Sequence, residues 1–261
     1  MSVDRLKALE GEREAAIELL SALSAEQWGM PSRCPGWTVK DVVAHMAASA
    51  HGLFTPWVLS MMRTKDAERH NDADVVKRQQ WAPAKVLHEY VTWTGRAALA
   101  HRAMQQPGIK SIPIKLGELG SYPSNLITSA IVFDTYLHMR FDIATALGLS
   151  MIPSQPNTLA ATLEWMMAGL GPMNPSSMSW LDQPVEMELV GPGGGTWTVA
   201  PSNGGHVVAT ATKGTGSVRI CCPAEKFPLW ATHRMPWREC DVTINGDDDV
   251  ATRFLDSVRI I

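Results

Sequence analysis

The stretch Cys34-Pro-Gly-Trp-Thr-Val-Lys-Asp-Val-Val-Ala-His45 decides how the first part of this chain folds. Within it, Thr38-Val-Lys-Asp41 has the pattern of a capping box, in which a hydroxyl and a carboxylate three residues later bond the free N–H groups at a helix start. A helix is therefore predicted to begin at Thr38 and to carry His45. The imidazole of His45 is a potential metal ligand on that helix.

A second stretch, Asp134-Thr-Tyr-Leu-His138-Met-Arg-Phe-Asp142, supplies complementary groups. Asp134 and His138 are four residues apart, so on a helix they lie one turn apart on the same face. Both can reach one cation, with His45 arriving from another helix. Two imidazoles and one carboxylate form a ligand set found at catalytic zinc sites, where the remaining position holds water or substrate.

Simpler interpretations compete with this metal site. His45 could be a satisfied core histidine, and Asp134 with His138 could be a hydrogen-bonded pair on a helix surface. The neighbouring Phe133 and Leu137 favour a buried setting for the pair. We therefore predict His45, Asp134 and His138 as metal ligands.

The pattern is helical from the start of the chain to about Gly171. A stripe of leucine and alanine marks a first helix, and Ser24-Ala-Glu-Gln27 is a second capping box. Further helices are predicted at Pro83–Gln106, Ser124–Leu147 and Asn157–Ala168. Long helices with connecting loops imply a bundle, and bundles commonly build metal sites from inward-facing side chains.

Glycine, proline and serine at Gly169–Ser177 predict a linker, after which the hydrophobic period changes to two. Strands are predicted at Val185–Leu189, Thr196–Ala200, His206–Thr212, Ser217–Cys222 and Asp241–Ile244, and helices at Ala224–Thr232 and Asp248–Val258. The fold class is therefore α+β, with a helical-bundle, metal-binding domain at residues 1–170 and a small C-terminal α+β domain at residues 184–261.

Composition limits the partners and the compartment. The 261 residues carry a formal net charge of -3, which gives no basic stripe for nucleic acid. Val42–Met62 has no charged residue, but its polar groups favour a buried helix over a membrane span. With no secretion signal at the start, we expect a cytoplasmic protein with reduced thiols, and Cys34 is interpreted as a small buried residue of its turn.

Both motif stretches, together with Trp28, resemble the mycothiol-dependent maleylpyruvate isomerase family, part of the wider group of DinB-like metalloproteins. The resemblance covers the whole chain and implies a DinB-like four-helix bundle followed by a small α+β domain. It also implies a divalent metal, usually zinc, held by His45, Asp134 and His138, and the thiol mycothiol as cofactor or cosubstrate. The family uses an arginine of the C-terminal domain near its site, for which Arg234 is the candidate here.

One residue departs from the family pattern. The best-understood members have Glu where this chain has Asp134, which is one methylene shorter. The carboxylate must therefore approach the metal more closely or act through a bridging water, which could weaken metal affinity or change the reaction.

Two further residues of the second stretch are candidates for supporting roles. Arg140, like Arg234, could stabilise negative charge developing on a substrate. Asp142 could orient an imidazole or a substrate hydroxyl. Alternatively, Arg140 and Asp142 could form a solvated charge pair, and Arg234 could be an ordinary cation at a helix end.

The predicted function is a mycothiol-dependent isomerase or thiol S-transferase that uses a metal-activated thiolate on a small electrophilic metabolite. A free thiol has a pKa of about 8.5 and is mostly protonated at neutral pH, whereas a thiol bound to a cation is deprotonated. The alternatives are a non-catalytic small-molecule-binding protein on the same scaffold and a thiol-independent enzyme in which the metal is a Lewis acid. A monomer and a homodimer are both compatible with the sequence.

Overall fold

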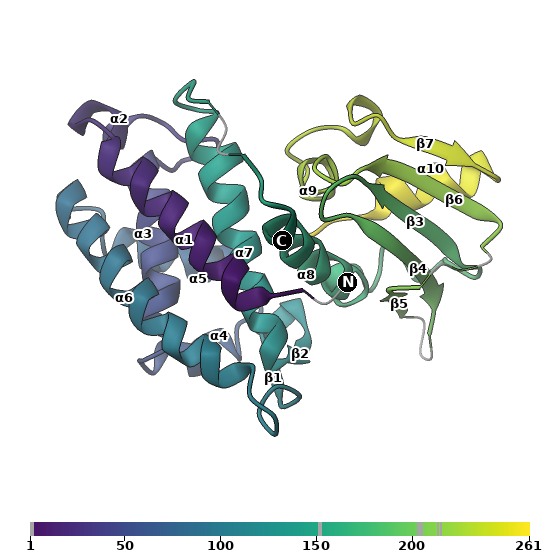
Figure 1. Ribbon diagram of the computed structural model, residues 1–261, viewed down its shortest axis with the longest axis horizontal. Helices are drawn as coiled ribbons and strands as arrows, with labels where there is room; N and C mark the ends of the chain where they lie inside the picture. The colour runs from purple at the N-terminus through teal and green to yellow at the C-terminus, as the bar shows by residue number, and fades with distance from the viewer. Residues whose placement is uncertain (1–2, 151–152, 203–205, 213, 215) are drawn as a thin grey trace. The chain divides into compact units, whose positions relative to one another are not determined.

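The computed structural model describes residues 3–150, 153–202, 206–212, 214 and 216–261. The chain forms two compact units, Asp4–Ser154 and Gln155–Ile261, of which the first is a helical bundle and the second contains a mixed sheet (Figure 1). The predicted α+β class is confirmed. Across the described residues, the helices are too short or too polar to cross a membrane.

Four long helices build the first unit, and shorter helices connect them (Figure 1). The long helices are α1 (Arg5–Ala22), α3 (Val39–Gly52), α6 (Pro83–Met104) and α7 (Ile127–Leu137). The short helices are α2 (Ala25–Gly29), α4 (Trp57–Met61) and α5 (Ala67–Val76). Both predicted capping boxes are present, at the starts of α2 and α3.

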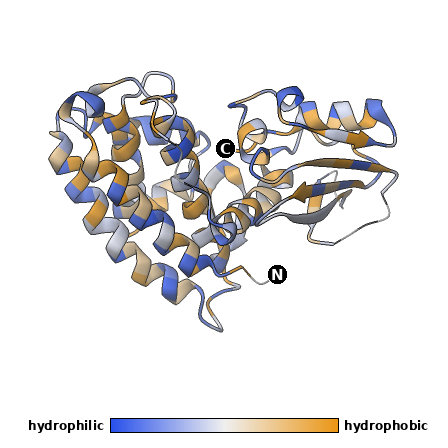
Figure 2. Ribbon diagram, turned by 45° about the horizontal axis from the view of Figure 1, so that its top comes forward, coloured by the Kyte–Doolittle hydropathy of each residue, from blue (hydrophilic) through white to orange (hydrophobic). Residues whose placement is uncertain are grey.

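The core of the bundle is centred on α3, whose valines and alanines are almost entirely buried. Val42 and Val43 on α3 pack in one cluster with Leu20 of α1, and with Val86 and Tyr90 of α6. Burying such a side chain stabilises a fold by about 1.5–3 kcal/mol. Hydrophobic and hydrophilic residues are interspersed along the bundle helices (Figure 2).

The last helix of the bundle changes its winding at the predicted metal residues. It begins as a 3₁₀ turn, η2 (Ser124–Leu126), continues as α7, and becomes a π-helix, η3, over His138–Ala144. The amide of Thr145 bonds the carbonyl of Arg140, five residues earlier. Such segments are rare and often occur at functional sites. The sequence pattern predicted one continuous helix and did not reveal this change.

A buried ion pair joins the π-helix to α1. The Arg140 guanidinium donates to Glu12 at 2.5 Å and 2.8 Å and lies 4.3 Å from the Tyr136 ring centroid. Arg140 and Asp142 are each 1% exposed, so the alternative of a solvated pair does not describe them. Arg140 therefore contributes to the fold through Glu12.

The second unit is a five-stranded sheet with helices packed on it. The strands are β3 (Val185–Val190), β4 (Gly195–Pro201), β5 (Val207–Thr210), β6 (Val218–Pro223) and β7 (Thr243–Asn245). Their order is β5-β4-β3-β6-β7, and β3 and β6 are parallel whereas the other neighbours are antiparallel. The accompanying helical segments are α8 (Pro156–Met173), α9 (Phe227–Ala231), η4 (Trp237–Glu239) and α10 (Asp248–Ser257).

The predicted linker at Gly169–Ser177 is partly helical, because α8 continues to Met173. Gly171 lies against the backbone of Val207 in β5, where an added Cβ would overlap the Val207 carbonyl. This glycine therefore permits close packing of helix on sheet. The sequence-based division placed α8 with the bundle, whereas in the structure α8 groups with the sheet.

A small hairpin in the first unit was not predicted. Its strands β1 (Pro113–Lys115) and β2 (Ser121–Pro123) pair antiparallel around the 3₁₀ turn η1 (Gly117–Leu119). Each strand has three residues, which is too short for an alternating hydrophobic pattern.

The Glu12–Arg140 pair gives a test of the bundle. We expect Glu12→Gln to lower the free energy of unfolding by about 3–5 kcal/mol, because it leaves a buried guanidinium without its counter-charge. Urea unfolding followed by circular dichroism measures this loss. Glu14→Gln, on the exposed side of the same helix, is the matched control and should change stability by less than about 0.5 kcal/mol. Equal stability of the two variants would contradict the proposed importance of the pair.

Candidate metal centre

A tight turn precedes α3 and is held in place from several sides. In Cys34-Pro-Gly-Trp37, the Trp37 amide bonds the Cys34 carbonyl at 3.1 Å, and Gly36 has φ +81°. Proline followed by a residue with positive φ is the signature of a type II turn, and glycine takes this conformation without strain. The Ser32 hydroxyl accepts from the Cys34 amide and donates to the Trp37 carbonyl. These hydrogen bonds hold the Cys34–Trp37 turn in one conformation.

His45 is held on the second turn of α3. Its side chain is 8% exposed, and the Trp37 ring lies 5.5 Å away between centroids. The Trp37 indole N–H donates to Asp72 of α5 at 3.0 Å, which fixes this neighbour. The capping box, the turn and the core valines together determine where the imidazole points.

The structure brings the three predicted ligands together. Asp134 Oδ1 lies 3.5 Å from His45 Nε2 and 3.4 Å from His138 Nε2, and the three ligand atoms lie within 4.8 Å of one another. These distances are long for a hydrogen bond. A tetrahedral zinc ion with bonds of about 2.0–2.1 Å would separate its ligand atoms by roughly 3.3 Å. The observed spacing therefore fits a cation between the three groups.

Electrostatics also favours a charged cluster at this position. Burial alone would raise the pKa of Asp134, but His138 and His45 outweigh it and hold this pKa well below its usual range. Burial alone would lower the pKa of His138, but Asp134, Asp142 and Cys34 raise it well above its usual value. Asp134 remains 29% exposed at its side chain, so a ligand can approach the cluster from solvent.

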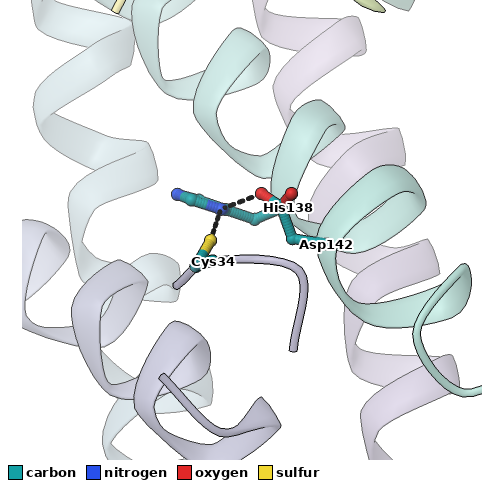
Figure 3. Close-up of side chains that lie close together, drawn as sticks. All are labelled: Cys34, His138 and Asp142. Atoms are coloured by element: carbon teal, nitrogen blue, oxygen red, sulfur yellow. Dashed lines mark hydrogen bonds and ion pairs between the residues drawn. The ribbon is translucent and has the colours of Figure 1, made fainter. Parts of the chain in front are cut away.

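The second nitrogen of His138 has its own partners. Nδ1 lies 2.8 Å from Asp142 Oδ2, and the Asp142 side chain is 2% exposed (Figure 3). A metal-ligating histidine commonly donates its other N–H to a carboxylate, which fixes the tautomer and the direction of the ring. Asp142 is placed to do this, with Nε2 directed at the Asp134 carboxylate.

Cys34 is a member of the cluster that the sequence analysis did not select. Its Sγ lies 3.8 Å from His138 Nδ1, the same ring nitrogen that Asp142 contacts (Figure 3). Cys34, His138 and Asp142 also have ligand atoms within 4.8 Å of one another. Cys34 is 104 residues from His138 in the chain, so no spacing pattern joins the two. The only signal was its presence in the same motif as His45.

The two predicted arginines belong to different units of the chain. Arg140 is bound to Glu12, as described above. Arg234 follows α9 in the second unit, where its amide bonds the Leu229 carbonyl. The role of Arg234 stays a prediction.

Comparisons with known proteins agree with the family resemblance. Residues 9–110 match the family model described as mycothiol maleylpyruvate isomerase N-terminal domain. Two uncharacterized proteins of Mycobacterium tuberculosis are similar in sequence. Rv0036c is 24% identical over 258 residues, which cover 95% of this chain and 91% of that protein. Rv0738 is 26% identical over 148 residues, which cover 57% of this chain and 70% of that protein.

Among solved structures, the crystal structure of the mycothiol-dependent maleylpyruvate isomerase matches with a TM-score of 0.59 at 16% identity, covering 95% of this chain and 97% of that one. At this identity the match shows a shared fold. Together with the family model it confirms the predicted resemblance to this family. The family model includes His45 but ends before Asp134 and His138.

The raised pKa of His138 gives a prediction about pH. A cation needs the neutral imidazole, so below the pKa of metal-free His138 it must displace a proton. Zinc affinity should therefore rise with pH, by up to about tenfold per unit, and should continue to rise above pH 6.5, the ordinary value for histidine. Competition with a chromogenic chelator across this range measures the slope. An affinity that levels off below pH 6.5 would contradict the expectation.

Removal of one ligand gives a second prediction. His45→Ala should reduce zinc affinity by at least about tenfold to a hundredfold, while leaving the helical circular dichroism spectrum unchanged, because the capping box and core of α3 remain. His88→Ala, at an exposed position of α6, is the matched control and should bind zinc normally. Equal zinc content in both purified variants would refute His45 as a ligand.

Proposed function

We propose that this chain is a mycothiol-dependent metalloenzyme, either an isomerase or a thiol S-transferase, that acts on a small electrophilic metabolite. One observation carries the proposal. His45, Asp134 and His138 come from two distant stretches and meet at distances that suit one divalent cation. The match to the mycothiol maleylpyruvate isomerase N-terminal domain supports a thiol-dependent reaction.

The donor set fits zinc. Two imidazole nitrogens and one carboxylate are borderline ligands that zinc accepts, and three protein ligands leave a position for a further molecule. When bound, such a cation would favour the thiolate form of a low-molecular-weight thiol at neutral pH. The shorter Asp134 reaches both histidines directly, which supports direct ligation in place of the family's glutamate.

The chain's own residues would orient and shield this chemistry. Asp142 accepts a hydrogen bond from the Nδ1–H of His138 and thereby directs Nε2 toward the metal as a ligand. Trp37 lies beside His45, and His45 and His138 are largely buried, so these residues limit the access of water. Asp134 remains the exposed member, and we infer that the substrate approaches from its side.

Addition of a thiolate to a conjugated acid places negative charge on the substrate, and a cationic side chain would stabilise it. Arg140 already binds Glu12 in the core of the bundle. Arg234 is therefore our candidate for this role.

We also propose a cytoplasmic location. Among the described residues, all of the cysteines are free thiols: Cys34, Cys221, Cys222 and Cys240. This state agrees with a reducing compartment, in which a low-molecular-weight thiol also stays reduced.

The experiment combines zinc-loaded protein, mycothiol and maleylpyruvate. We expect turnover that needs both zinc and thiol, seen by NMR as double-bond isomerisation with the thiol returned unchanged. An S-transferase would form the mycothiol adduct of an electrophile such as monobromobimane faster than the uncatalysed reaction without protein, as followed by mass spectrometry. Asp142→Asn should lower kcat by about tenfold to a hundredfold through loss of His138 orientation, whereas His88→Ala should be as active as the parent.

The thiol dependence separates the alternatives. Zinc-dependent turnover without a thiol would replace the proposal with Lewis-acid chemistry. If zinc-loaded protein neither turned over nor bound mycothiol in calorimetry, the scaffold would be a non-catalytic binding protein.

A further inference from the structure

The His138 ring has a ligand set on each of its two nitrogens. Nε2 faces Asp134 and His45, which are the ligands of the proposed catalytic metal. Nδ1 faces Cys34 Sγ at 3.8 Å and Asp142 Oδ2 at 2.8 Å (Figure 3). This second set contains a thiol, a carboxylate and an imidazole, each with a free lone pair once deprotonated.

We propose that Cys34, His138 and Asp142 form a second metal site, which binds a thiophilic divalent cation such as zinc, with His138 shared between the two sites. A soft thiolate ligand favours zinc over magnesium or calcium, which prefer oxygen. The site is independent of mycothiol, because Cys34 supplies its sulfur from the chain.

Distances support the coordination. A tetrahedral zinc ion with a zinc–sulfur bond of about 2.3 Å and a zinc–nitrogen bond of about 2.0–2.1 Å separates these two atoms by roughly 3.6 Å. The 3.8 Å between Cys34 Sγ and His138 Nδ1 is close to this value. Asp142 Oδ2 sits at hydrogen-bond distance from Nδ1 and would move back by roughly 0.5 Å to become a ligand.

The sulfur is held in position by the backbone around it. The amide of Arg33 donates to the Asp142 carbonyl at 3.0 Å, which ties the residue before Cys34 directly to the π-helix. The Cys34 amide donates to the Ser32 hydroxyl, and the turn that follows closes on the Cys34 carbonyl. The turn that carries Cys34 and the π-helix that carries His138 and Asp142 are thus hydrogen-bonded to each other without a cation, as expected for a preformed site.

Proton and charge balance are compatible with filling both sites. Binding at the second site releases the Cys34 thiol proton and the His138 Nδ1 proton to solvent. With both sites filled, His138 would be an imidazolate with one nitrogen for each cation, and Asp142 would hold the second cation in place of the Nδ1–H hydrogen bond that it accepts when only the first site is filled. The four negative groups, Asp134, Asp142, Cys34 and the ring, then neutralise the two doubly charged cations.

Cobalt(II) titration of the metal-free full-length chain, without added thiol, tests the site. Cobalt replaces zinc in such sites, and a bound thiolate gives a sulfur-to-cobalt charge-transfer band in the near ultraviolet. We expect two cobalt ions per chain and this band. Cys34→Ser should remove the band and reduce the content to one cobalt ion, whereas His45→Ala should also bind one but keep the band.

Cys221→Ser is the matched control, because Cys221 is also half-buried but lies in the second unit, where it donates to Glu188. This variant should keep both the band and the stoichiometry, and circular dichroism should show that each variant is folded. One cobalt ion per chain without the band would overturn the proposal, as would a band that persists in folded Cys34→Ser. Since no mycothiol is present, failure of this test leaves the thiol-dependent function to its own assay.

Discussion

The imidazole of His138 is held between two carboxylates, and the candidate site depends on this arrangement. Asp134 lies at Nε2 and Asp142 at Nδ1, so the ring has a fixed direction and a raised pKa. A histidine with one carboxylate partner could rotate or change tautomer. With two, Nε2 is held at the point that His45 reaches from α3, where a metal would displace its proton.

The π-helix and the Cys34 turn are two local departures from regular structure that meet at this ring. The π-helix carries His138, Arg140 and Asp142, and it uses Arg140 to hold α1 through Glu12. The turn places Cys34 and Trp37 around the same cluster. The regular helices provide the core and carry His45 and Asp134, and these two segments add His138, Asp142 and Cys34.

Local rules in the sequence predicted much of this. The capping boxes predicted the starts of α2 and α3, and the one-turn spacing of Asp134 and His138 predicted that both would face one partner. The fold class followed from the change of period after the bundle. Contacts between distant residues were not predictable in this way. Cys34 reaches His138, and Glu12 reaches Arg140, across more than a hundred residues and without any repeating pattern. The sequence pattern grouped α8 with the bundle instead of the sheet. Glycines such as Gly171 are as typical of a linker as of a helix that packs closely on a sheet, so composition alone did not distinguish the two.

The Glu12–Arg140 pair also bears on how the bundle is made. The two residues are 128 positions apart, on the first and last helices of the unit. A chain that leaves the ribosome N-terminus first exposes Glu12 long before its partner has been synthesised. The buried face of α1 can therefore be paired only after the π-helix has been synthesised. Contacts between residues so far apart in the chain slow folding. The bundle is consequently expected to close late, as one cooperative body, and not helix by helix during translation.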